Sequence, residues 1–165
     1  MRQDRERRTG QNMETKSRQK TENWMRLEFE AKSENESLAR IAVASFITPL
    51  NPTLEEMADV KTAVSEAVTN AIIHGYEEEG GIVYIRCRLK QDLLEVEIED
   101  KGRGIEDIDQ AMEPLFTTKP EQDRSGMGFS FMEAFMDELE VMSVPGAGTC
   151  VLMKKKLGTC AWFEV

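Results

Sequence analysis

The sequence predicts an α+β fold, a two-layer α/β sandwich in which helices lie on one face of a single sheet. Three observations predict it. The chain has 165 residues, about the size of one domain. Its apolar residues alternate along some segments and recur at helical spacing along others. The segments with helical spacing stand before and between pairs of strand-like segments joined by short turns, which favours antiparallel pairing.

Composition places the chain among ordinary globular proteins, with 40% hydrophobic and 32% charged residues. No apolar run approaches the roughly 18 residues of a membrane span, and no apolar leader follows the first residues, so we expect a cytoplasmic protein with no membrane partner. The single histidine and three separated cysteines cannot supply the ligand set of a usual zinc site. A formal net charge of −10 argues against direct binding of nucleic acid, because the body of the protein would repel phosphate.

Residues 1–24 contain no Leu, Ile, Val or Phe and carry more basic than acidic residues. Such a segment buries too little apolar surface to offset its ordering entropy, so we predict a disordered basic extension. Over residues 25–31, apolar and charged residues alternate as in a half-buried strand. Ser33 and Glu36 form a capping-box pattern for a first helix, which Pro49 ends.

A second capping-box pattern, Thr53 with Glu56, opens a long helix whose apolar residues recur every three or four positions. This helix is predicted to stop near Gly75, since glycine is common just past a helix end. Two β-rich runs, residues 82–87 and 93–98, follow and are predicted to form an antiparallel hairpin.

The C-terminal third contains a short predicted helix near residues 105–112, a helix at 126–136 and a final hairpin. The strands of that hairpin are predicted at residues 139–144 and 149–157, on either side of a turn rich in proline and glycine. Residues 158–165 form a C-terminal tail in this division of the chain.

Glu66 and Asn70 lie four residues apart in the second predicted helix, and so on one helical face. A carboxylate there can accept a proton or orient a nucleophile, and an amide oxygen is a hard ligand suited to Mg²⁺. A polar pair of this spacing also occurs on ordinary solvated helices, so the pair alone leaves both interpretations open.

Asp100, Gly102 and Gly104 follow directly on an apolar strand. Glycine permits positive φ and close approach of the backbone, and an aspartate can accept a hydrogen bond from an exocyclic amine such as that of adenine. A plain turn has the same pattern, so this segment is also ambiguous by itself.

Residues 125–128, Ser-Gly-Met-Gly, precede a helical segment, where free backbone N–H groups can hold phosphate oxygens. The Lys-Ser/Thr ending of a P-loop is absent. The polar segment at residues 116–124 is either a surface loop or a lid that closes over a nucleotide. Its two cations, Lys119 and Arg124, can offset phosphate charge.

The order of these features along the chain is specific, and three longer strings add to it, at residues 65–76, 114–120 and 124–129. They resemble the sporulation anti-sigma F factors, which are serine kinases of the GHKL ATP-binding family. The resemblance covers about residues 25–157, the predicted ATP-binding and anti-sigma domain. It implies the Bergerat fold, with a mixed, mostly antiparallel sheet and helices on one face.

The resemblance also implies a role for each matching residue. Glu66 is implied to be catalytic, as the base or orienting carboxylate, and Asn70 to hold Mg²⁺. Asp100, with Thr149 nearby, is implied to recognise the adenine amine of ATP. The remaining implied nucleotide contacts are Gly102 and Gly104 near the base, Ser125, Gly126 and Gly128 at the phosphates, and Thr117, Thr118, Lys119 and Arg124 in the lid.

Function and partners follow from the same resemblance. Its members bind and inhibit a sporulation sigma factor of the sigma F type when ATP is bound, phosphorylate a serine of an anti-anti-sigma factor, and are homodimers. Arg40, the only cation on the first predicted helix, is a candidate partner contact. Two alternatives share the ATP site: a stress-response anti-sigma serine kinase, and a non-catalytic sigma-binding module that depends on ATP.

Overall fold

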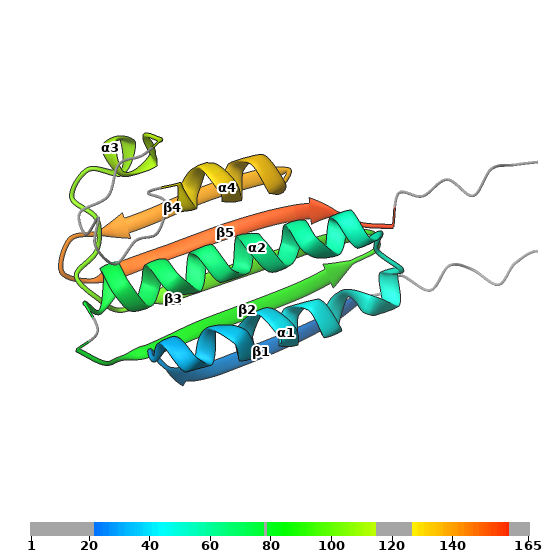
Figure 1. Cartoon of the computed structure of the whole chain (residues 1–165), viewed down its shortest axis with the longest axis horizontal. Helices are drawn as coiled ribbons and strands as arrows, with labels where there is room; N and C mark the ends of the chain where they lie inside the picture. Colours follow the sequence, from blue (N-terminus) through cyan, green and yellow to red (C-terminus); the bar gives the residue numbers. More distant parts are fainter. Residues whose placement is uncertain (1–21, 78, 115–126, 159–165) are drawn as a thin grey trace, which may run out of the picture.

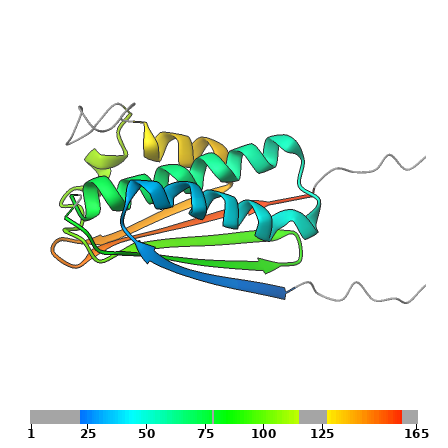
Figure 2. The same cartoon turned by 60° about the horizontal axis from the view of Figure 1, so that its bottom comes forward.

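The structure is a computed structural model that describes residues 22–77, 79–114 and 127–158. Within these residues, helices cover one face of a five-stranded sheet, which is the predicted two-layer α+β sandwich (Figure 1). Figure 2 shows the helical layer above the sheet, with the other face of the sheet uncovered. None of the helices in these three stretches is long and apolar enough to span a membrane.

The sheet has the strand order β1-β2-β3-β5-β4. Its strands are β1 (Glu22–Glu30), β2 (Ile82–Lys90), β3 (Leu93–Asp100), β4 (Glu138–Val144) and β5 (Gly148–Lys156). The helices are α1 (Glu36–Ile47), α2 (Leu54–Asn70), α3 (Ile108–Met112) and α4 (Gly128–Phe135). Short 3-10 helices (Ser33–Asn35 and Thr48–Leu50) flank α1, and a π-helix (Ala71–Gly75) continues α2.

Every pairing among the described strands is antiparallel, so the sheet is antiparallel there rather than mixed, which corrects the expectation. The reason lies in the connection from β1 to β2, which passes through two helices running in opposite directions, α1 and α2 (Figure 1). Two connecting helices leave the next strand antiparallel to the first, whereas a single crossover helix makes the two strands parallel.

The first strand begins earlier than the alternation of residues predicts. Residues 22–24, the end of the predicted disordered extension, belong to β1 and pair with residues 88–90 of β2. Ladder hydrogen bonds use only backbone groups, so this end of the strand pairs although Trp24 is 74% exposed. Residues 1–21 of the predicted extension and residues 159–165 of the predicted tail lie outside the described residues.

The two predicted capping boxes have different outcomes. In α2 the box forms: the Glu56 N–H donates to Thr53 Oγ1 at 3.0 Å, and the Thr53 N–H donates to Glu56 Oε2 at 2.8 Å. At Ser33 the prediction is wrong, because no side chain caps there and α1 begins only at Glu36. The chain first makes a 3-10 turn, which leaves Ser33 one turn before the α-helix.

The core lies between the helical layer and the sheet. Val43 of α1, Val64 of α2 and Met132 of α4 are fully buried together with Ile85 and Val96 from the central strands. Burial of each such side chain stabilises the fold by about 1.5–3 kcal/mol. This packing fixes α2 over the sheet, so that its C-terminal end lies above the end of β3 and the start of β5 (Figure 1).

Candidate functional site

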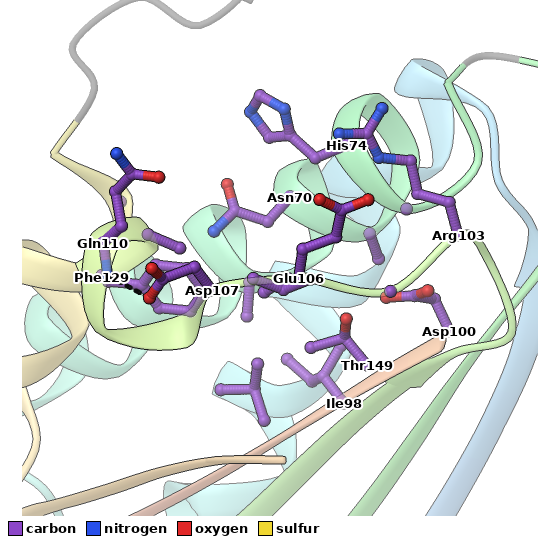
Figure 3. A pocket seen from close by; sticks show the side chains of 18 of the residues that line it. Asn70, His74, Ile98, Asp100, Arg103, Glu106, Asp107, Gln110, Phe129 and Thr149 are labelled. Atoms are coloured by element: carbon purple, nitrogen blue, oxygen red, sulfur yellow. Dashed lines mark hydrogen bonds between the residues drawn. The ribbon is translucent and has the colours of Figure 1, made fainter. Parts of the chain in front are cut away.

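A cavity of about 230 Å³ lies at the end of the sheet where β3 ends and β5 begins (Figure 3). The end of α2 with its π-helix, the loop after β3, α3 and the start of α4 surround it. It brings together the predicted site residues Asn70, Asp100, Gly104, Gly128 and Thr149, which are far apart in the sequence.

Asp100 is the last residue of β3 and pairs in register with Thr149, the second residue of β5. Both are buried, and they lie next to each other in the cavity (Figure 3). The Gly102 N–H donates to Asp100 Oδ1 at 2.9 Å, which holds the carboxyl group in position. Burial raises the pKa of Asp100, and hydrogen bonds from the backbone of Gly102 and Thr149 partly oppose that rise.

Close backbone packing sets the position of Asp100. A Cβ at Gly75 would lie 2.7 Å from Asp100 Oδ1, and a Cβ at Gly102 would lie 2.0 Å from the Gly75 carbonyl oxygen. The Arg103 N–H donates to that same carbonyl at 2.9 Å. Gly102 therefore packs on the end of the π-helix and is not among the residues lining the cavity, whereas Gly104, with φ of +73°, lines it.

The π-helix at residues 71–75 shapes the opposite wall. Its wider turn closes with the Tyr76 N–H donating to the Ala71 carbonyl at 3.0 Å. Single π turns inside or at the end of α-helices are frequent at functional sites. Here the turn places His74 and Gly75 in the cavity wall. His74 lies near Asn70 (Figure 3).

Glu66 and Asn70 meet the start of α4 on one face of α2. A Cβ at Gly128 would lie 3.2 Å from Glu66 Oε2 and 3.2 Å from Asn70 Nδ2. Asn70 and Gly128 line the cavity, and Glu66 lies beside them rather than in its wall. The carboxylate, the amide and the first residue of a helix are thus within a few ångströms of one another. The four-residue spacing predicts that Glu66 and Asn70 share a face, and the resemblance implies that Gly128 joins them.

The side-chain oxygens of Asn70 and Glu66 fit a magnesium ion carried by a nucleotide. The donor set, an amide oxygen next to a carboxylate, consists of the hard ligands that Mg²⁺ takes. The described residues contain no group of three or more His, Cys, Asp or Glu that could hold a metal by itself. Mg²⁺ that takes most of its ligands from phosphates and water needs only one or two protein ligands.

Sequence reasoning missed several lining residues: His74, Gly75, Arg103, Asp107, Gln110 and Phe129. Some adjoin predicted motifs, since Arg103 stands between Gly102 and Gly104 and Phe129 follows Gly128. Their positions next to a predicted motif could have identified these residues. Asp107 and Gln110 have no such signal, and they meet through the N-cap of α3, where the Gln110 N–H donates to Asp107 Oδ1 at 3.0 Å.

The remaining predicted residues fall into two groups. The lid residues Thr117, Thr118, Lys119 and Arg124, and the loop residues Ser125 and Gly126, lie outside the described residues. Arg40 is on α1, where its Nε lies 3.5 Å from Oε1 of Glu36 one turn earlier.

Comparison with known proteins gives matches over most of the chain. A family model described as "Histidine kinase-like ATPase domain" matches residues 29–155. The anti-sigma F factor of Clostridium perfringens (strain SM101 / Type A) is 58% identical over 139 residues, 84% of this chain and 99% of the relative. The anti-sigma F factor of Clostridium acetobutylicum is 60% identical over 135 residues, 82% of this chain and 94% of the relative.

A third relative, the anti-sigma F factor of Thermoanaerobacter pseudethanolicus, is 57% identical over 137 residues, 83% of this chain and 96% of the relative. Among solved structures, the fold is similar to the RsbU and RsbW domains of Rv1364c from Mycobacterium tuberculosis, with a TM-score of 0.59 at 18% identity. That match covers 82% of this chain and 32% of the other, so this chain spans about a third of its length.

Proposed function

This chain belongs to the anti-sigma F factors, with the histidine kinase-like ATPase domain of the GHKL family, and we propose that it is an ATP-dependent inhibitor of a sigma factor and a serine kinase. In this proposal it binds a sporulation sigma factor of the sigma F type while it holds ATP. It then phosphorylates a serine of the anti-anti-sigma factor that opposes this inhibition.

A single observation carries the proposal: Asn70, Asp100 and Gly128 line one cavity, and Glu66 lies against Gly128. Asp100 and Thr149 are neighbours in its lining and form what we call the base end, and Asn70 and Gly128 are neighbours that form what we call the phosphate end. A nucleotide has the same two ends, a base and a chain of phosphates. The cavity thus offers hydrogen-bond acceptors to an amine and a helix start to phosphate oxygens.

At the base end, an ionised Asp100 accepts a hydrogen bond from the adenine amine. At the phosphate end, the first N–H groups of α4 would hold anionic oxygens, as helix N-termini do. Asn70 would contribute one ligand to Mg²⁺, which would neutralise charge on the phosphates. We assign Lys119 and Arg124 to a lid that offsets the remaining phosphate charge, with Thr117 and Thr118 in the same segment and Ser125 and Gly126 completing the phosphate loop.

For the transfer, Glu66 accepts the proton of the partner's serine hydroxyl. The serine oxygen forms a bond to the γ-phosphorus as the bond from that phosphorus to the bridging oxygen of ADP breaks. The protein's part in this step is to bind and orient both substrates and to hold the proton on Glu66.

The partners in this proposal are proteins rather than nucleic acid, consistent with the formal net charge of −10. We propose that the chain acts as a homodimer and that Arg40 on α1 contacts a partner. On the same helix, Leu38 and Ile41 are 55% and 58% exposed and provide an apolar surface that a partner could cover.

The test is to mix the full chain with Mg²⁺, ATP labelled at the γ-phosphate and a candidate anti-anti-sigma protein, and to look for label on serine. Label on serine that requires both this chain and the partner protein supports the kinase activity. Tight, ATP-dependent binding of a sigma factor without any phosphate transfer would favour the non-catalytic binding module over the kinase.

A further inference from the structure

Ser143 of β4 lies behind the base end of the cavity and contacts three groups at once. Its Oγ is 2.8 Å from the Ile105 N, 3.0 Å from the Gly148 carbonyl oxygen and 2.9 Å from Thr149 Oγ1. Ser143 and Thr149 are direct cross-strand partners in the β4–β5 pair. Ser143 itself does not line the cavity, whereas Thr149 does.

The directions of these three hydrogen bonds follow from counting protons. A serine hydroxyl has one proton to donate and two lone pairs to accept with. The Ile105 N–H can only donate, and the Gly148 carbonyl can only accept. If all three contacts are hydrogen bonds, Ser143 gives its one proton to Gly148, and Thr149 must donate its own proton to Ser143.

A Thr149 hydroxyl that donates to Ser143 presents only its lone pairs to the cavity. The neighbouring Asp100, when ionised, is also an acceptor and nothing else. The base end then offers acceptors from two adjacent strands, and it favours a ligand with a hydrogen-bond donor there. It disfavours a ligand with an oxygen at the same position, since two acceptors would face each other without a proton.

We propose that Ser143 is a positioning residue for nucleotide selectivity: by accepting the Thr149 proton, it keeps that hydroxyl an acceptor and favours 6-amino over 6-oxo purines. This inference rests on the proposed function, because it assumes that the cavity takes a purine nucleotide. In this proposal Ser143 acts through Thr149 and does not contact the ligand itself.

The test compares ATP with ITP. The base of ATP has an amine at position 6, whereas the base of ITP has an oxygen there and a proton on N1. The affinities of wild-type protein and Ser143→Ala for both are measured by calorimetry, with Mg²⁺ present. Without Ser143, the Thr149 hydroxyl can turn and donate to the ITP oxygen. We expect the preference for ATP over ITP to fall about tenfold, the value of roughly one hydrogen bond. The ratio of two affinities on one protein does not depend on the fraction that is folded.

Two further variants separate positioning from a general loss of structure. In a Thr149→Val background, Ser143→Ala should leave the ATP/ITP ratio unchanged, because the hydroxyl that it positions is gone. Ser143→Thr, which keeps a hydroxyl, should restore most of the wild-type ratio. A Ser143→Ala protein that weakens both nucleotides equally, or one that shifts the ratio just as much in the Thr149→Val background, would overturn this inference alone. Wild-type protein that binds neither nucleotide would overturn both the inference and the proposed function.

Discussion

Asp100 is only 5% exposed, although its carboxyl group can ionise. Burial raises its pKa because the charged form loses hydration, and the backbone hydrogen bonds from Gly102 and Thr149 offset only part of that loss. The folded protein therefore holds this proton more tightly than the unfolded chain does. Above the raised pKa, the unliganded protein carries the full cost of a buried charge, which a donor on a ligand would reduce.

This linkage predicts that Asp100→Asn stabilises the unliganded protein, although we expect the same variant to bind the nucleotide more weakly. As pH rises from the ordinary aspartate pKa through the raised pKa of Asp100, the free energy of unfolding contributed by this group falls, and then it levels off. Asparagine does not titrate, so the unliganded variant should gain stability relative to wild type over that range. Urea unfolding of both proteins without nucleotide, at a series of pH values, measures the difference. A difference that stays constant or shrinks as pH rises would contradict the effect of burial.

Glu66 is the residue on which catalysis and nucleotide binding should separate. Glu66→Gln keeps the size of the side chain and removes its ability to take a proton. We expect the rate of phosphate transfer to the partner serine to fall by about 10²–10⁴, with the affinity for ATP almost unchanged. Glu55→Gln, on the exposed first turn of the same helix, is the matched control and should transfer at the normal rate. Normal transfer by the Glu66 variant would remove the general base from the mechanism.

At the scale of single elements, a capping-box pattern occurs at or just before the start of both α1 and α2, but it forms a cap only in α2. Thr53 and Glu56 exchange both bonds of a capping box, while Ser33 makes no cap. Thr53→Ala should therefore destabilise the protein by about 1 kcal/mol, which lowers the melting temperature by roughly 2–4 °C in a protein of this size. Ser33→Ala is the matched control and should change it by less than about 1 °C. Thermal unfolding of the two variants decides, and equal losses at both positions would contradict the assignment of the caps.

The comparison of these two caps indicates what the sequence could predict. Periodicity found the strands and helices because burial on one face imposes it, as at Leu27 in β1 and Val64 in α2. It could not separate Ser33 from Thr53, because the outcome depends on tertiary structure. Glu56 Oε2 also accepts from the Gly158 N–H at 3.1 Å, a contact across 102 residues of sequence.

The candidate site follows the same rule. The sequence predicts Asn70, Asp100 and Gly128 because each stands in a short motif, and the family resemblance connects these motifs. Ser143 and Gln110 carry no motif. Ser143 acquires its position only because β4 pairs with β5 in a register that sets it opposite Thr149, and a single sequence does not reveal such a register.

At the scale of the whole molecule, the cavity joins parts of the fold that are far apart in sequence. The end of α2, the loop after β3, the start of α4 and the start of β5 all contribute to its walls. A ligand that bridges them must oppose their separation, and so it should stabilise the fold as a unit. The free energy gained depends on concentration as RT ln(1 + [L]/Kd) and reaches about 2.7 kcal/mol at one hundred times Kd.

We therefore expect Mg²⁺ and ATP at that concentration to raise the melting temperature of the wild-type chain by roughly 5–10 °C. Glu66→Gln should show the same rise, because it lacks only the proton acceptor. Asp100→Asn should need about 10- to 100-fold more ATP for an equal rise, since a donor replaces the acceptor that we propose for the adenine amine. Asp92→Asn, in the exposed β2–β3 turn, controls for the loss of a carboxylate elsewhere. Differential scanning calorimetry across an ATP titration measures all four proteins. If ATP stabilises Asp100→Asn as readily as wild type, the base does not lie against Asp100, and the orientation of the nucleotide in the cavity must be reversed or abandoned.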